Sequence, residues 1–299
     1  MSKTLVGVVT FGNLPFTKLT IESIQNTVTK PHKIFAVVGK PGDTETEKWL
    51  RDSDISHVVH SENWGFPFSL NDIYDYAWTE HDYDYLAIIG NDVIAYPRAI
   101  DSLIEVADTH DYEWVCASQY EIRQLLKEFP EYQQYFGSAF QVTDFSHRCW
   151  ERFENWNRPM SIVGPGMSDV HNLALYKKSV FEKVGYIDVN FYPAYFSDND
   201  YCRRSANLGI TSCTLLNAMY FHFWSRTIHQ EEGGSTHDFF RANSTFYRMK
   251  WGGPFGKEAF SVPFNGHDFI LGKDIVLPST TEIFDRSQEI AIIKYWMNR

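Results

Sequence analysis

The sequence predicts an α/β protein in which a mainly parallel central sheet is flanked by helices. Two observations lead to this fold class. Short runs of β-branched and apolar residues alternate with longer segments of helical spacing, the pattern of right-handed strand–helix–strand crossovers. In addition, residues 86–89 form an uncharged apolar run that stops at Gly90, as expected for a strand buried on both faces of a parallel sheet.

The segments before this run alternate regularly. Strands are predicted at 5–10, 33–38 and 55–60, and helices at 16–27, 44–51 and 68–78. Thr44 is the expected N-cap of the second helix, with Glu47 in the capping-box position. After the run at 86–89, a helix is expected to begin at Pro97, followed by a strand at 114–117.

Beyond residue 119 the periodicity is weaker. The predicted helices are 121–135, 179–184 and 200–207, of which the last two end at Gly185 and Gly209. The predicted strands are 172–176 and 211–216. There is no internal repeat or low-complexity linker, so both halves are expected to share one sheet.

Composition narrows the class of protein. The net charge of −11 disfavours indiscriminate binding to nucleic acid or anionic lipid. Aromatic content is high, at 16%, and these rings either fill the core or form stacking platforms. The N-terminus lacks a secretion signal, no apolar stretch approaches the ~18 residues of a spanning helix, and the four cysteines form no C-x-x-C pair. We therefore expect a cytoplasmic protein with reduced thiols and no membrane span.

Several common nucleotide and metal motifs are missing. The chain contains no G-x-x-x-x-G-K-[ST] loop, no G-x-G-x-x-G after its first strand and no H-E-x-x-H. A bound nucleotide would therefore have to be held by strand-end loops and a metal ion.

Two acidic sites have the chemistry for such a role. Asn91 and Asp92 follow the buried strand at its carboxyl end, where open α/β sheets bind ligands and where a carboxylate can hold a divalent cation. Asp198 and Asp200 stand two residues apart, ahead of basic residues 203–204. The alternatives are an Asn-Asp turn at the first site and a helix-capping cluster at the second.

Six motifs in order resemble the inverting glycosyltransferases of family two, which have the GT-A fold. They are Asn63-Trp64-Gly65, Asn71, Asn91-Asp92, Gly185-Tyr186-Ile187-Asp188, the segment 198–204 with Asp198-Asn199-Asp200, and His222. Lys250-Trp251-Gly252-Gly253 is also similar to a sequence near the end of some members. The resemblance spans roughly residues 4–253. Ser197 departs from it, because the family usually has Glu before the base.

The resemblance implies roles for the acidic residues. Asp198 occupies the position of the catalytic base, and Asp200 would stay ionised nearby, orient the acceptor or cap the next helix. Asp92 would bind a divalent metal, Mn²⁺ or Mg²⁺, with His222 as a second ligand. For His222 the alternative is a core histidine on an aromatic strand.

The resemblance also implies a binding site for a nucleotide-sugar donor, most often a UDP-sugar. The residues expected to contact the nucleotide, its ribose or its diphosphate are Thr10, Phe11, Val38, Gly39, Asn63, Asn71, Asn91, Arg226 and Lys250. For the asparagines the alternative is a loop or cap role, and for the two basic residues it is solvated surface.

These expectations divide the single domain into a donor-binding half (1–118), an acceptor-binding, catalytic half (119–230) and a C-terminal extension (231–299). The acceptor would be a glycan hydroxyl or, as in some bacteriophage enzymes, a hydroxylated DNA base extruded from the duplex. The arginines then expected to follow the DNA phosphates are Arg203, Arg204, Arg241 and Arg248. The net charge argues against the DNA acceptor. From a different class, Ser197 leaves open a non-catalytic sugar- or nucleotide-binding module with a degenerate GT-A fold.

Overall fold

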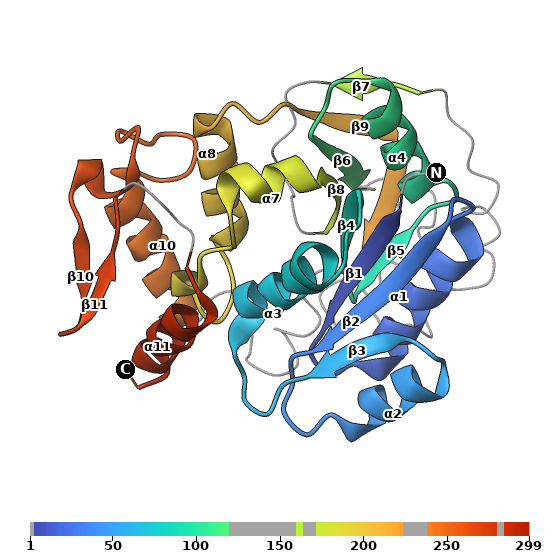
Figure 1. The fold of residues 1–299 in the computed structure, drawn as a ribbon, viewed down its shortest axis with the longest axis horizontal. Helices are drawn as coiled ribbons and strands as arrows, with labels where there is room; N and C mark the ends of the chain where they lie inside the picture. Colours follow the sequence, from blue (N-terminus) through green and yellow to red (C-terminus); the bar gives the residue numbers. More distant parts are fainter. Residues whose placement is uncertain (1–2, 120–159, 164–171, 224–237, 280–283, 299) are drawn as a thin grey trace, which may run out of the picture.

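The computed structural model describes residues 3–119, 160–163, 172–223, 238–279 and 284–298. Within these ranges, one sheet contains nine strands: β1 (Thr4–Thr10), β2 (His32–Val38), β3 (Ser56–Val59), β4 (Tyr85–Gly90), β5 (Val93–Ala95), β6 (Trp114–Gln119), β7 (Ile162–Val163), β8 (Leu173–Lys177) and β9 (Ser212–His222). Their order is β3-β2-β1-β4-β8-β6-β9-β5, and β7 pairs with β9 (Figure 1). Strands on both sides of residue 119 therefore share one sheet.

The sheet is mixed but mainly parallel, as predicted. Strands β3, β2, β1 and β4 are parallel neighbours, and β6 and β9 run in the same direction as these four. Strand β8 is antiparallel to both β4 and β6, and the short β5 is antiparallel to β9. The direction of β8 was not predicted, because a strand buried on both faces has the same apolar pattern whichever way it runs. Strand β5 itself was not predicted, because three residues are too few to show a period.

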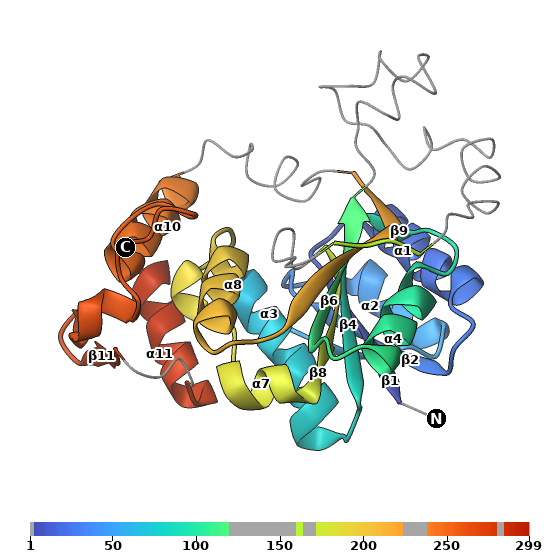
Figure 2. The same cartoon turned by 90° about the horizontal axis from the view of Figure 1, so that it is seen from above.

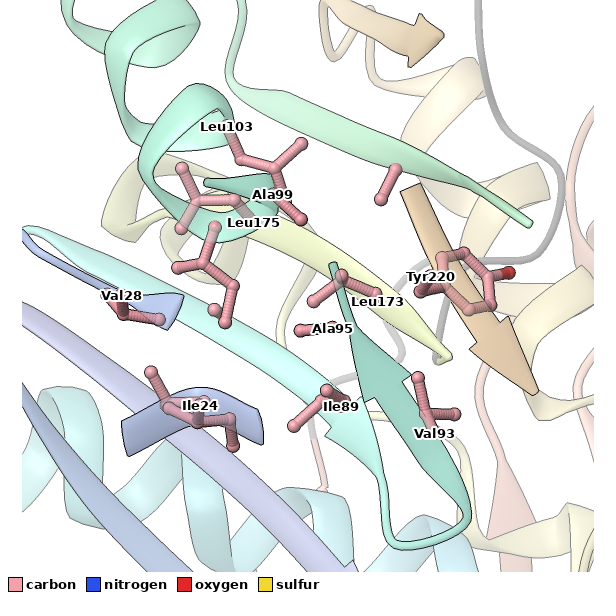
Figure 3. Close-up of a cluster of buried hydrophobic side chains, with 14 of the residues drawn as sticks. Ile24, Val28, Ile89, Val93, Ala95, Ala99, Leu103, Leu173, Leu175 and Tyr220 are labelled. Carbon is pink, nitrogen blue, oxygen red and sulfur yellow. The ribbon is translucent and has the colours of Figure 1, made fainter. Parts of the chain in front are cut away.

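Helices cover both faces of this sheet. The helices of the central region are α1 (Leu14–Thr27), α2 (Thr44–Asp52), α3 (Gly65–Tyr74), α4 (Ala99–Thr109), α7 (Lys178–Val184) and α8 (Ser197–Asn207). Apolar residues of α1, α2 and α4 pack on one face, where Figure 3 shows Ile24 and Leu103 directed toward Ile89 and Leu175 of the sheet. Helices α3, α7 and α8 pack on the other face through a second buried cluster.

Local differences from the predicted elements have physical causes. Asp43, not Thr44, caps α2, because its carboxylate accepts a hydrogen bond from the backbone N–H of Thr46. Helix α3 begins at Gly65 and passes into a π-helical segment, η1 (Asp75–Glu80). Helix α8 begins three residues before the predicted start at Asp200, and β9 continues to His222. The predicted helix 121–135 lies outside the described residues.

The C-terminal part forms a separate layer at one end of the molecule, beyond α7 and α8 (Figures 1 and 2). It contains α10 (Asp238–Trp251), η5 (Pro263–Gly266), the hairpin β10 (Phe269–Leu271) and β11 (Ile275–Leu277), and α11 (Arg286–Met297). Its aromatic core also includes Phe191 of the short helix η4 (Val189–Phe191).

The sequence analysis also made predictions about the cysteines and about membrane-spanning helices. Cys116, Cys202 and Cys213 are buried free thiols, as predicted, and Cys149 lies outside the described residues. Over the part of the chain that the structure describes, no helix has the length and apolarity needed to cross a membrane.

Candidate active site

The carboxyl ends of β1 and β2 lie side by side at one edge of the sheet. Thr10 is paired with Val38, and the backbone N–H of Gly39 donates to the carbonyl of Thr10 over 2.8 Å. A Cβ atom on Gly39 would lie 3.4 Å from the Phe11 ring and 3.3 Å from Ser69 Oγ, so both side chains approach the backbone of Gly39 closely. The structure therefore brings Thr10, Phe11, Val38 and Gly39 together. Thr10 and Val38 are fully buried, and of these four residues only Phe11 is half-buried.

Asn91 joins the end of β4 to the loop that follows β1. Its side-chain N–H₂ donates to the carbonyl of Gly12 over 3.5 Å and to Thr17 Oγ1 over 3.3 Å. Its own carbonyl accepts a bond of 2.8 Å from Thr20 Oγ1. Asn91 is 7% exposed. Through these bonds Asn91, which directly precedes Asp92, holds the loop containing Phe11 in place.

Asp92 and His222, which are distant in the sequence, meet at the same edge of the sheet. The pairing of β5 with β9 sets Val93 opposite His222, and the N–H of Phe223 donates to the carbonyl of Asp92 over 2.9 Å. As a result, Asp92 Oδ1 lies 3.3 Å from His222 Nε2. The two side chains keep 11% and 14% of their surface exposed, so both can reach a ligand at the rim.

This pair fits a cation that keeps several non-protein ligands. Among the described residues, no group of three or more His, Cys, Asp or Glu side chains is arranged to enclose a metal. A carboxylate and an imidazole would therefore leave most coordination positions to phosphate oxygens and water. Imidazole nitrogen suits transition metals, whereas Mg²⁺ prefers oxygen ligands, so this donor set suits Mn²⁺ better than Mg²⁺.

Asp198 lies in the first turn of α8, directly after a sharp turn. It is half-buried, and its Oδ1 accepts a 2.9 Å bond from the N–H of Asn199. The chain ahead of it contacts the first turn of α3, where the N–H of Phe66 donates to the carbonyl of Pro193 over 2.7 Å. Helix α3 follows β3, whose carboxyl end lies at the same sheet edge as Gly39. The chain leading into Asp198 therefore contacts a helix that begins near this edge.

Asp200, in contrast, points into the protein. It is fully buried, with Oδ1 2.7 Å from Lys250 Nζ and 2.8 Å from Trp251 Nε1, and with Oδ2 2.9 Å from Arg204 Nε. Burial alone would raise the pKa of Asp200, but the charges of Lys250 and Arg204 outweigh it and hold the pKa below its ordinary value. Lys250 Nζ also lies 2.8 Å from Asp188 Oδ2 and is almost completely buried. Lys250 thus neutralises two internal carboxylates, and its ammonium is not directed to solvent.

Of the remaining residues predicted to contact the donor, the two asparagines have structural roles. Asn71 is fully buried, and its amide exchanges two hydrogen bonds with the backbone of Ile187, at 2.8 and 2.9 Å. Asn63 Oδ1 accepts from the N–H of Gly65 over 3.1 Å, which is a loop-forming role. Arg226 lies outside the described residues.

Two residues of this region had no predicted role. Asp188 is the second carboxylate held by Lys250, and it also caps η4 through the N–H of Asn190. Asn243 of α10 donates to the carbonyls of Tyr192 and Ala194 ahead of Asp198. Asp188 carried a signal in its place within the G-x-x-D motif, whereas Asn243 carried none.

Comparisons with known proteins identify the family of the chain and support its fold. The sequence model of the family described as glycosyl transferase family 2 matches residues 5–185. A solved structure of the mannosyltransferase PcManGT from Pyrobaculum calidifontis, in complex with GDP-Man and Mn²⁺, is similar with a TM-score of 0.51 and 12% identity, over 83% of this chain and 62% of that one. Residues 1–349 of TarS from S. aureus match with a TM-score of 0.49 and 8% identity, over 74% and 60% of the two chains. The chain thus spans less than two thirds of either relative's length. No curated protein sequence matches it significantly.

Proposed function

Because the chain belongs to glycosyl transferase family 2, we propose that it is a metal-dependent, inverting glycosyltransferase that uses a nucleoside-diphosphate sugar. The observation that carries this proposal is the meeting of Asp92 and His222, 3.3 Å apart, at the sheet edge where Thr10 and Gly39 also lie. A carboxylate and an imidazole at the carboxyl ends of the strands can hold a cation that binds a nucleotide diphosphate without a phosphate-binding loop.

In this proposal the nucleotide lies at the ends of β1 and β2. Phe11 is half-buried there, and its ring would stack on the base. Asn91 holds the loop that carries Phe11 and does not need to touch the ligand. We propose UDP as the nucleotide, and the GDP-Man bound by PcManGT makes a GDP-sugar the natural comparison.

Asp92 and His222 would hold the cation. When bound, a divalent ion supplies Lewis-acid neutralisation of the departing diphosphate. The role of this chain's residues is to place a carboxylate and an imidazole on one side of the donor, beside the loop that Asn91 clamps. Mn²⁺ is the proposed ion, from the mixed donor set and from the ion bound by PcManGT.

Asp198 is the proposed base. Inversion needs a group that takes the proton of the acceptor hydroxyl on the face opposite the leaving diphosphate, as the oxygen attacks the anomeric carbon. Asp198 is the half-buried carboxylate of the pair, whereas Asp200 already bonds to Lys250, Trp251 and Arg204. In this proposal Asp200 and Lys250 support the first turn of α8 from inside and do not contact substrate.

We propose a glycan hydroxyl as the acceptor. Of the arginines expected to follow DNA phosphates, Arg204 is 4% exposed and donates to Asp200 and to the carbonyls of Val184 and Tyr186. That leaves fewer exposed cations for a DNA duplex, on a chain with a net charge of −11.

The decisive experiment is a panel of UDP- and GDP-sugars, assayed with Mn²⁺ for release of free nucleoside diphosphate. Asp198→Asn is expected to lower the rate by about 10²–10⁴-fold with donor binding retained, because a general base contributes that much. Asp92→Asn is expected to raise the Mn²⁺ concentration needed for half-maximal rate. Asp238→Asn, an exposed acid in the first turn of α10, is the matched control and should behave as wild type.

Full activity in both Asp92→Asn and Asp198→Asn would refute the assignment of these residues. A wild-type protein that is stabilised by UDP and Mn²⁺ in thermal melts, yet releases no nucleotide from any donor, would instead identify a non-catalytic binding module.

A further inference from the structure

The turn that precedes Asp198 has a conformation that its residues do not favour. Tyr195 and Phe196 have φ angles of 71° and 66°, in the left-handed region that bulky side chains rarely adopt. Two adjacent aromatic residues in this region cost conformational free energy, and such a turn persists only where the surroundings over-determine it. The contacts that hold the turn in this conformation therefore also help to set the position of Asp198.

Helix α10 supplies the constraint through one buried amide. Asn243 is 3% exposed, and its side-chain N–H₂ donates to the carbonyl of Tyr192 over 3.1 Å and to the carbonyl of Ala194 over 2.7 Å. These two acceptors lie on either side of Pro193, whose own nitrogen has no hydrogen to donate. A single side chain thus holds both ends of the segment that leads into the turn.

Aromatic rings of the same helix pack against the two strained residues. The ring of Tyr195 lies 5.8 Å from that of Phe239 and 5.1 Å from that of Phe240. The ring of Phe196 lies 5.2 Å from that of Phe240 and 5.9 Å from that of Tyr247. Ring packing fills the space around the turn, whereas the Asn243 amide bonds directionally to two backbone carbonyls ahead of it, and the N–H of Phe66 bonds to the carbonyl of Pro193 between them.

The turn determines where α8 starts. The N–H of Asp200 donates to the carbonyl of Phe196 over 3.0 Å, so the first turn of α8, with Asp198 inside it, is built on the strained residue. The inner side of the same first turn is held by α10 as well, since Asp200 bonds to Lys250 and Trp251. A shift of Phe196 would therefore move the Asp198 carboxylate relative to the donor.

We propose that Asn243 is a positioning residue for Asp198, and that the C-terminal extension thereby completes the active site. Helix α10 lies beyond residues 5–185, which match the family model, so no motif of that region predicts this role. The proposal rests on the proposed function in one respect only, which is that Asp198 acts as the base.

The test compares Asn243→Ala, Asn243→Ser and Asn243→Asp with wild type in two measurements. Hydrogen exchange reports opening of the turn, and Asn243→Ala is expected to speed exchange of the Asp200 amide at least tenfold. Donor turnover reports the base: kcat is expected to fall at least tenfold in the Ala and Asp variants, with the KM for donor unchanged. Asn243→Ser retains one hydroxyl donor and should recover part of the rate.

Asn207→Ala is the matched control, because Asn207 likewise donates to a backbone carbonyl, that of Ser261, but from the other end of α8. It should leave both measurements at the wild-type value. If the Ala variant does not fold, the Ser and Asp variants decide the question through the same two readouts.

Each outcome has one meaning. Unchanged exchange at Asp200 in the Asn243 variants overturns the proposed constraint, whether or not the protein is active. Faster exchange with wild-type kcat overturns the positioning role. If exchange is faster in the Asn243 variants but the wild-type protein releases no nucleotide from any donor, the proposed function is refuted and the proposed constraint stands.

Discussion

Replacing Lys250 with Met tests the buried charge network under α8. The ammonium of Lys250 lies 2.8 Å from Asp188 Oδ2 and 2.7 Å from Asp200 Oδ1, and none of these three side chains is more than 2% exposed. Met preserves most of the volume and removes the charge. Asp200 keeps Arg204 and Trp251, whereas Asp188 keeps, among the residues that the structure describes, two bonds from Asn190.

The expected cost follows from leaving one buried anion without its cation. Breaking a buried ion pair by removing one partner destabilises proteins by about 3–5 kcal/mol. At roughly 2 °C per kcal/mol for a chain of this size, the melting temperature should fall by about 6–10 °C. Lys257→Met, an exposed lysine just after α10, is the control and should melt near the wild-type temperature.

The pH dependence of stability gives an independent check on this prediction. In wild type the lowered pKa of Asp200 contributes stability that is present above its ordinary pKa of 3.8 and is lost as the pH falls below it. Without the lysine charge, only Arg204 and Trp251 oppose the effect of burial on the pKa of Asp200, so that pKa should rise relative to wild type. The difference in free energy of unfolding between wild type and Lys250→Met should therefore widen as the pH rises from below 3.8 to neutral pH.

Urea denaturation at several pH values, with Asp188→Asn in both backgrounds, measures the coupling directly. The double variant should be less destabilised than the sum of the single ones, since it no longer buries an uncompensated charge at position 188. A Lys250→Met protein with wild-type stability at every pH would refute this account of the network.

Two further predictions concern Glu289 of α11 and Gly65, the first residue of α3. Burial raises the pKa of Glu289 to about 8, against the attraction of Arg286, so the folded state retains a proton that the unfolded state loses above 4.5. Stability should therefore fall from pH 4.5 to 8, by at most roughly 5 kcal/mol over that interval, and Glu289→Gln should flatten the decline in denaturation curves; an unchanged slope would contradict it. Gly65 has a φ of 83°, and a Cβ atom would lie 2.8 Å from the Tyr192 ring, so Gly65→Ala should cost about 1–3 kcal/mol in thermal melts. Gly209→Ala, at a φ of 69° with no atom within 4 Å of its Cβ, isolates the backbone cost, and an equal loss in both variants would show that the collision is unimportant.

Local patterns were enough for most elements of the first half, but not for the three-residue strand β5. Strand β4 was predictable because an uncharged apolar run ending at Gly90 has few other uses, and the place of Asn91 and Asp92 at its carboxyl end followed directly. The proximity of Thr10 and Gly39 was likewise predictable, because the carboxyl ends of parallel strands meet at one edge of the sheet.

The partners of the polar side chains could not be predicted in this way. Asp200 and Lys250 have the residue types of a substrate site, yet each is the other's buried counter-ion. Asn71 lies on a predicted helix with its amide apparently available, and the structure uses both ends of that amide on the backbone of Ile187. A charge or an amide in a sequence indicates what can be bound, but not whether another part of the chain already binds it.

The amino-acid sequence by itself determined the α/β class, the family resemblance and the residues at the strand ends, because these depend on short-range periodicity and on a few motifs in order. The tertiary structure decided that Asp92 meets His222 and that Asp200 pairs with Lys250, and it decided the antiparallel directions of β8 and β5 and the contribution of α10 to the turn before Asp198. The physical reason is that burial and pairing depend on contacts between residues far apart in the chain. Such contacts leave no local periodicity that a sequence can display.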